Sequence, residues 1–178
     1  MKSLNERLKS EFKHGKILLI SIGSEKYRET QRGIVDFLAK TQEKVCYVTL
    51  NDPFDCIASN LGNREISGLF FIDCVSSTVK SPKAERNVAF VSSPRALTEI
   101  SIAIKSALAK GSDFIVFDSI SAMLVYEEPL SILKFIHSIV LALRQTKSEA
   151  AFIILMEDAA SGIFKDLKMF VDGVIEVI

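Results

Sequence analysis

One short segment near the start of the chain has the residue types and the spacing of a phosphate-binding loop. Its residues are Gly23, Ser24, Glu25, Lys26, Tyr27, Arg28, Glu29 and Thr30. The pattern of such a loop is G-x-x-x-x-G-K-[ST], in which backbone N–H groups wrap the phosphates, the lysine binds the β and γ oxygens and the hydroxyl binds magnesium. Gly23 and Thr30 keep this spacing, but Arg28 replaces the second glycine and Glu29 replaces the lysine.

These two replacements predict that ordinary triphosphate binding fails. Glu29 would place a negative charge beside the γ-phosphate, and like charges about 4 Å apart cost about 4 kcal/mol at an effective dielectric near 20. Arg28 brings a side chain to a position where backbone must approach the ligand closely. An atypical loop is the alternative, because Lys26, Arg28 and Thr30 supply two cations and a hydroxyl near a helix N-terminus, which attracts anions. That alternative predicts a nucleotide-binding protein or slow ATPase that uses ATP and magnesium.

A second candidate site follows the apolar run Asp113–Asp118. In nucleotide hydrolases an aspartate at the end of such a strand holds the magnesium shell. If the protein is active, Thr30 and Asp118 would hold the metal, and Asp52 and Asp118 would be the catalytic acids. We favour the simpler interpretation, that Asp118 caps the next helix or turn, and we expect neither a metal nor catalysis.

The elements that would position these residues alternate between strand and helix. Continuous apolar runs are typical of strands buried on both faces of a parallel sheet; they cover Lys16–Gly23, Val45–Leu50, Leu69–Cys74, Asp113–Asp118, Ala150–Met156 and Gly173–Ile178, with a weaker candidate at Val88–Val91. Helical spacing covers Thr30–Lys40, Pro94–Ala109, with Ser93 as its cap, and Pro129–Gln145. The alternation predicts an α/β fold of three α/β/α layers around a mostly parallel sheet.

An amphipathic helix is expected at the N-terminus. Leu4, Leu8 and Phe12 lie on one stripe of Ser3–Lys13. That stripe either docks on its own domain or packs on a partner subunit. The predicted organisation is a short helix over residues 1–13 and a single domain over 14–178.

The composition is typical of a folded domain and disfavours nucleic-acid and membrane binding. The 178 residues are 48% hydrophobic and 25% charged, which is ordinary for a folded domain, and the formal net charge is zero. Balanced charge disfavours nucleic-acid binding, for which Lys80–Arg86 is a weak candidate. No signal peptide opens the chain and no apolar run is long enough to cross a bilayer. We therefore expect a cytoplasmic protein with no membrane contact and with its three cysteines reduced.

Several segments together resemble the KaiC-type branch of the RecA superfamily of ATPases. The matching segments are Lys16–Gly23, Glu43–Pro53, Phe54–Gly62, Gly68–Asp73, Ala109–Met123 and Val171–Val177. The resemblance implies a P-loop ATPase fold, a RecA-like domain over 14–178, head-to-tail assembly and an archaeal origin. The family's acidic pair after the second strand corresponds to Asn51 and Asp52, of which only Asp52 could act as a base. With the phosphate loop also altered, the chain resembles a degenerate member that lacks a functional Walker A motif.

These observations favour a non-catalytic module that acts through protein–protein contacts. We expect a regulatory or scaffold role associated with signalling, a protein partner or homo-oligomer, and no cofactor. A receiver-like signalling domain is less favoured, because Gly23 and Ser24 replace its acidic pair. A metalloenzyme is also less favoured, because His14 and His137 lie far apart without ligand partners.

Overall fold

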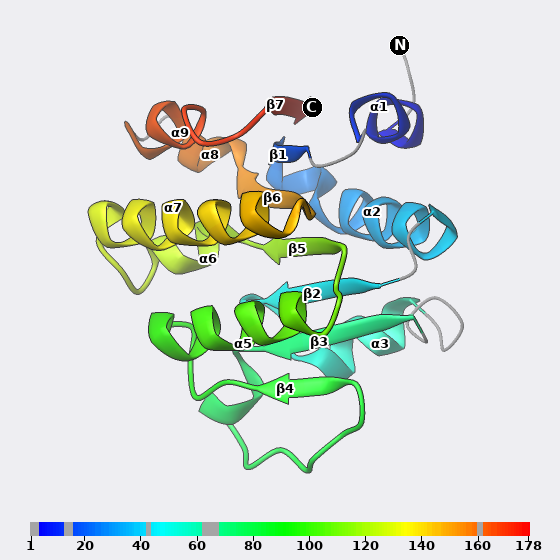
Figure 1. The fold of residues 1–178 in the computed structure, drawn as a ribbon, viewed down its shortest axis with the longest axis vertical. Helices are drawn as coiled ribbons and strands as arrows, with labels where there is room; N and C mark the ends of the chain where they lie inside the picture. The colour runs from blue at the N-terminus through cyan, green and yellow to red at the C-terminus, as the bar shows by residue number, and fades with distance from the viewer. Residues whose placement is uncertain (1–3, 13–15, 42–43, 62–67, 160–161) are drawn as a thin grey trace.

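A parallel sheet forms the centre of the molecule (Figure 1). The computed structural model describes residues 4–12, 16–41, 44–61, 68–159 and 162–178. Within these residues the sheet has seven strands in the order β4-β3-β2-β5-β6-β1-β7, and every neighbouring pair is parallel. The strands are β1 (Ile17–Ile22), β2 (Val45–Thr49), β3 (Leu69–Asp73), β4 (Val88–Phe90), β5 (Phe114–Asp118), β6 (Glu149–Leu155) and β7 (Gly173–Val177). The predicted strands are thus present, including the weaker candidate, which forms β4.

Helices cover both faces of the sheet, as the alternating sequence pattern predicted. Helices α5 (Leu97–Ala109), α6 (Ile120–Leu124), α7 (Pro129–Thr146) and α9 (Gly162–Leu167) pack on one face, and α1 (Leu4–Glu11), α2 (Tyr27–Thr41) and α3 (Phe54–Leu61) on the other. A short helix, α8 (Met156–Ala159), follows β6. None of the helices that the structure describes has both the length and the apolarity to cross a membrane.

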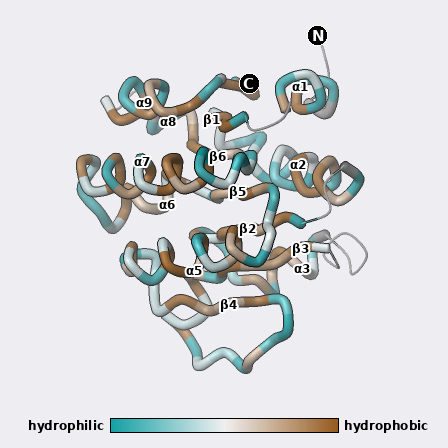
Figure 2. Tube along the Cα trace, viewed as in Figure 1, coloured by the Kyte–Doolittle hydropathy of each residue, from teal (hydrophilic) through white to brown (hydrophobic). Residues whose placement is uncertain are grey.

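Side chains along β1 divide between the two faces in the alternating way that a pleated strand requires. Ile17 and Leu19 join the core beneath α5 and α7, whereas Leu18 and Ile20 join the core beneath α2. All four are fully buried. Figure 2 shows the same division, with brown, hydrophobic stretches in the strands and alternating brown and teal along α2, α5 and α7. Burial on both faces explains why the strand sequences are continuously apolar.

Helix α1 docks on its own domain. Leu8 is fully buried in the core under α2. The Phe12 ring lies 4.7 Å from that of Phe114 and 6.3 Å from that of Phe37, measured between centroids. Of the two interpretations of the amphipathic N-terminal segment, the structure supports docking within the chain.

Two helix starts differ from the sequence prediction. Helix α5 begins at Leu97, not at Pro94, and its N-cap is Ala96 without a side-chain capping bond. Residues 93–96 form a turn instead, in which the Ala96 N–H donates to the Ser93 carbonyl at 3.1 Å. Helix α2 begins at Tyr27, three residues before the predicted start at Thr30.

The parallel arrangement brings all strand ends of one kind to the same side of the sheet. At the carboxyl ends lie Gly23 after β1, Asn51 and Asp52 after β2, and Ser119 after β5. Strand β6 separates β1 from β5. Ligands of open α/β sheets bind at such carboxyl ends, so these residues lie at the end of the sheet where a ligand site would be expected.

Candidate functional site at the carboxyl end of the sheet

The connection between β1 and α2 is a compact turn. Gly23 is followed by a 3₁₀ turn at Ser24–Lys26, closed by a 2.9 Å hydrogen bond from the Lys26 N–H to the Gly23 carbonyl, and α2 starts directly at Tyr27. Helical backbone therefore begins two residues before Glu29, the residue at the lysine position. A phosphate-wrapping loop needs several consecutive free backbone N–H groups, and this turn leaves little backbone for that purpose.

One backbone donor of the turn is occupied by the protein itself. The Ser24 N–H donates to the Glu157 carboxylate at 3.2 Å, and hydrogen bonding with Ser24 lowers the pKa of Glu157. Glu157 lies on α8, the short helix that follows β6. A carboxylate of the chain thus lies where the turn would receive an anion.

Asp118 is the central residue of the site and is completely buried. Its carboxylate accepts hydrogen bonds from the Tyr27 hydroxyl at 2.6 Å, from the Gln31 amide at 2.8 Å and from the Tyr47 hydroxyl. Burial raises the pKa of Asp118, while the three hydrogen bonds oppose that rise. The donors come from α2 and β2, so two separate elements enclose the aspartate.

The proposed capping role of Asp118 is wrong. Ser119 is the N-cap of α6, and its side chain accepts a 3.3 Å hydrogen bond from the Ala122 N–H. The Asp118–Ser119 peptide bond is cis. The Asp118 side chain instead belongs to the buried hydrogen-bond cluster with Tyr27, Gln31 and Tyr47, which we call the Asp118 cluster.

Asn51 extends the Asp118 cluster toward solvent. Its amide donates to the Tyr27 hydroxyl at 3.0 Å and to the Ser119 hydroxyl at 3.1 Å. Burial, followed by the charge of Asp118, raises the pKa of both Tyr27 and Tyr47. Both phenols therefore remain protonated at physiological pH and act as donors to the carboxylate.

Arg28 and Asp52 form an ion pair at the rim of the site. The two Arg28 amino groups bind the two Asp52 carboxylate oxygens, one of them at 3.1 Å. The Arg28 side chain is 62% exposed and that of Asp52 16%, and the hydrogen bonding raises the pKa of Arg28. The candidate phosphate-binding cation and the candidate base thus neutralise each other.

The remaining loop residues do not converge on a common point. Lys26 makes a long 3.5 Å contact with Glu29 one helical turn away, and both side chains face solvent. Ser24 and Glu25 are exposed. Thr30, the candidate metal ligand, is 2% exposed. Among the described residues, no group of three or more His, Cys, Asp or Glu is placed to hold a metal ion.

Asp73 lies where a receiver domain would carry its phosphate-accepting aspartate, and its side chain is hydrogen-bonded within the chain. Asp73, at the end of β3, is completely buried. It accepts 2.8 Å hydrogen bonds from the N–H groups of Phe54, Val75 and Ser76. These bonds fix the start of α3 and the turn after β3, so Asp73 has a structural role at this position.

Sequence reasoning found Asp118, Asp52 and the altered loop but missed Gln31 and Tyr47. The available signal for Tyr47 was a hydroxyl inside an otherwise apolar buried strand, since a buried tyrosine usually has a hydrogen-bond partner. Gln31 gave no comparable signal, because a glutamine in the first turns of a helix is ordinary on an exposed surface. Only the packing of α2 over the ends of β2 and β5 identifies its partner.

Comparison with known proteins shows similarity in structure but not in sequence. No protein-family model matches the chain, and no curated protein is similar to it in sequence. Among solved structures, a KaiC-like protein from the hyperthermophilic archaeon Pyrococcus horikoshii superimposes with a TM-score of 0.70 at 14% identity, covering 99% of this chain and 77% of that one. The chain therefore has the three-layer, RecA-like fold of a KaiC-like protein.

Proposed function

We propose that the protein is a non-catalytic RecA/KaiC-like module that acts through protein–protein contacts in a regulatory or scaffold role associated with signalling. The observation that carries the proposal is the state of Asp118, whose carboxylate is fully buried and accepts three side-chain hydrogen bonds. An aspartate that organises a magnesium shell must be ionised and reachable by the metal's waters.

Freeing Asp118 for such a role would be costly. A hydrogen bond to a charged group contributes about 1.5–3 kcal/mol to stability, and a nucleotide would have to compete with three of them. Burial also raises the pKa of Asp118, which disfavours the ionised form that a metal needs. The Asp118 cluster thus favours a structural role for this carboxylate.

The phosphate loop supports the same proposal through independent contacts. The Glu157 carboxylate accepts a hydrogen bond from the Ser24 N–H, and Asp52 forms an ion pair with the Arg28 guanidinium. Glu29 stands in the lysine position with an exposed carboxylate. The residues that would attract a triphosphate are therefore satisfied within the chain or carry the wrong charge.

An exposed apolar turn suggests where a protein partner would bind. Val125, Tyr126 and Leu130, between α6 and the first turn of α7, are 76%, 48% and 62% exposed. We call them the α6–α7 turn patch. Neighbouring exposed apolar side chains of this size are characteristic of protein contact sites, and tyrosine is enriched in interfaces. A second copy of the chain or another protein would cover the patch.

Thermal unfolding with and without about 1 mM Mg-ATP or Mg-ADP tests the non-catalytic part. A nucleotide that bound at ~10 μM would add about 2.7 kcal/mol and raise the midpoint by about 5–11 °C at this chain length. We expect no shift and no phosphate release. A shift of that size, or turnover that Asp118→Asn abolishes, would contradict the proposal.

Light scattering over a range of concentrations tests the contact part. If the partner is a second copy, Val125→Asp should shift the chain toward monomer. Val79→Asp, which alters a similarly exposed valine in another loop, serves as the matched control and should leave assembly unchanged. Equal behaviour of the two variants would exclude the α6–α7 turn patch as the self-association site.

A second candidate function is nucleotide binding through an atypical loop. It rests on the two cations Lys26 and Arg28 near the start of α2, both with partly exposed side chains. Binding there would require the Arg28–Asp52 pair to open. Asp52→Asn, which weakens that pair, should then increase the nucleotide-induced shift, whereas the first proposal predicts no shift in either protein.

A further inference from the structure

A separate cavity lies at the amino-terminal ends of the strands, whereas Asp118 lies at their carboxyl ends. It opens at the amino-terminal ends of β2 and β3 and beside the last turn of α5, with a volume of about 230 Å³. Roughly eight water molecules, at ~30 Å³ each, would fill this volume. The cavity is therefore large enough for a small organic molecule with one ring and a head group.

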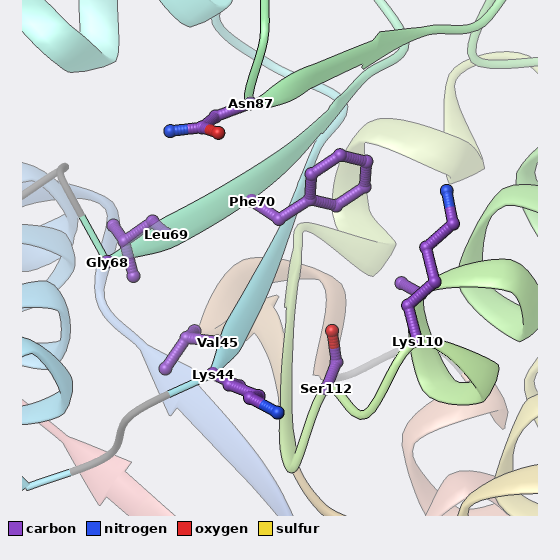
Figure 3. Close-up of a pocket in the computed structure, with 9 residues that line it drawn as sticks. Lys44, Val45, Gly68, Leu69, Phe70, Asn87, Lys110 and Ser112 are labelled. Carbon is purple, nitrogen blue, oxygen red and sulfur yellow. The ribbon is translucent and has the colours of Figure 1, made fainter.

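The walls of the cavity are apolar and its rim is polar. The Phe70 ring stands beside the opening and Ala107 is buried on the same face of the sheet, whereas the Val45 and Leu69 side chains are buried in the core of the other face and line the cavity from its edge. Figure 3 shows Lys44 and Ser112 below the Phe70 ring and Lys110 beside it, whereas the Asn87 amide is directed away from the ring. Apolar surface combined with a few polar groups is the usual composition of a small-molecule site.

The charge around the opening is unbalanced. Lys44 and Lys110 are the charged residues in the described part of its lining, and neither forms an ion pair with a described carboxylate. Four other lysines of the chain do pair with carboxylates, namely Lys16, Lys26, Lys40 and Lys80. In a chain of zero net charge, the described lining of this cavity therefore carries a local positive charge.

Backbone geometry places Lys44 over the turn that ends α5. The Lys44 carbonyl accepts a 2.9 Å hydrogen bond from the Asp113 N–H, which joins the start of β2 to this turn. Gly111 has a φ of +90°, and a β-carbon there would come within 3.3 Å of the Lys44 ammonium nitrogen. The absence of a side chain at position 111 thus leaves room for the lysine over the turn.

We propose that this cavity binds a small phosphate monoester that carries one flat apolar ring. The phosphate would lie between the ammonium groups of Lys44 and Lys110, and the ring would pack against Phe70. A phosphate monoester carries a charge of about −1.5 to −2 at neutral pH and has three strong acceptor oxygens. Those properties match two unpaired lysines together with the Ser112 hydroxyl, which has no hydrogen-bond partner among the described side chains.

The test is a ¹H–¹⁵N NMR titration of the full chain with phenyl phosphate. We expect saturable shifts at Gly68, Asn87 and Ser112. Lys44→Ala and Lys110→Ala should each weaken binding about fivefold, the upper range for an exposed ion pair. Lys105→Ala, which removes an exposed lysine from α5, the helix that Lys110 caps, is the matched control and should leave the affinity unchanged.

Further ligands and one variant separate the head group from the ring. Inorganic phosphate and benzoate should each bind more weakly than phenyl phosphate, and Phe70→Leu should weaken phenyl phosphate but not inorganic phosphate. Three outcomes would overturn the proposal: no localised shifts up to about 10 mM, equal affinity for phenyl phosphate and inorganic phosphate, or a loss in Lys105→Ala as large as in Lys110→Ala. The site is distant from the nucleotide loop, so none of these outcomes depends on the proposed function.

Discussion

Removing one hydroxyl from the Asp118 cluster should destabilise the whole domain. In Tyr47→Phe the ring remains in place, 5.6 Å from the ring of Phe71, but the hydrogen bond to Asp118 is lost. Because this bond joins a buried donor to a buried carboxylate, its loss should cost about 1.5–3 kcal/mol. At roughly 2–4 °C per kcal/mol for a chain of this length, the midpoint of thermal unfolding should fall by about 3–12 °C.

The pH dependence of the same cluster has a definite sign. Burial raises the pKa of Asp118 in the folded protein above its unfolded value of about 3.9. The folded state then binds the proton more tightly, so this residue's contribution to stability is full below about pH 3.9 and is lost as the pH rises through the folded pKa. As the pH rises from about 3.9 to above the folded pKa, the stability of Asp118→Asn relative to the parent should therefore increase, and at higher pH it should stay constant.

Calorimetry of four proteins checks the reasoning. The parent, Tyr47→Phe, Asp118→Asn and the double variant form a thermodynamic cycle, and the penalty of Tyr47→Phe should shrink when residue 118 is neutral. Tyr126→Phe, at a half-exposed tyrosine, is the control and should change stability by less than about 0.5 kcal/mol. Equal penalties for Tyr47→Phe in both backgrounds would refute the hydrogen-bond explanation and point to packing alone.

Three further predictions concern parts of the fold away from the cluster. Cys56 is exposed, whereas Cys46 and Cys74 are buried and have raised pKa values. Mass spectrometry should therefore show that a thiol reagent labels one cysteine per chain in the native state and three in denaturant. Rapid labelling of Cys46 would contradict the core described above. Gly111→Ala should cost about 1–2 kcal/mol because of its positive φ, measured by urea unfolding, and a neutral effect would count against that backbone conformation. Leu8→Ala should cost about 2–5 kcal/mol, as expected for a fully buried side chain; a loss below 0.5 kcal/mol would mean that α1 does not dock on the domain in solution.

Much of the fold could be predicted because burial on both faces leaves a clear signal in the sequence. The run before Gly23 predicted β1 to within one residue, since a doubly buried strand excludes polar side chains. Helix α7 begins at Pro129 as predicted, because proline fits the first turn of a helix. The same rule failed at Pro94, where the chain makes a turn and Glu99 binds back to Ser92 at 2.9 and 2.8 Å. That contact joins residues seven positions apart, which local capping patterns do not describe.

The site was less predictable than the fold. Asp118 could be identified from its place at a strand end, but its environment depends on Tyr27, Gln31 and Tyr47, which lie 71 to 91 positions earlier in the chain. Nothing local links these residues. The loop substitutions, in contrast, are local, so the altered charge at Glu29 could be recognised from sequence alone.

The contact between α1 and β7 has a consequence for how truncated proteins should be interpreted. β7 pairs with β1 on one side only, and the Val177 carbonyl points to that side, where it accepts from the Gly23 N–H. The neighbouring Glu176 carbonyl therefore points outward, and Arg7 of α1 donates to it. A strand with an open outer side is a template for strand addition by another chain, and α1 partly covers this one. Aggregation of a protein that lacks residues 1–13 would therefore report an uncovered strand and not the loss of a native partner contact.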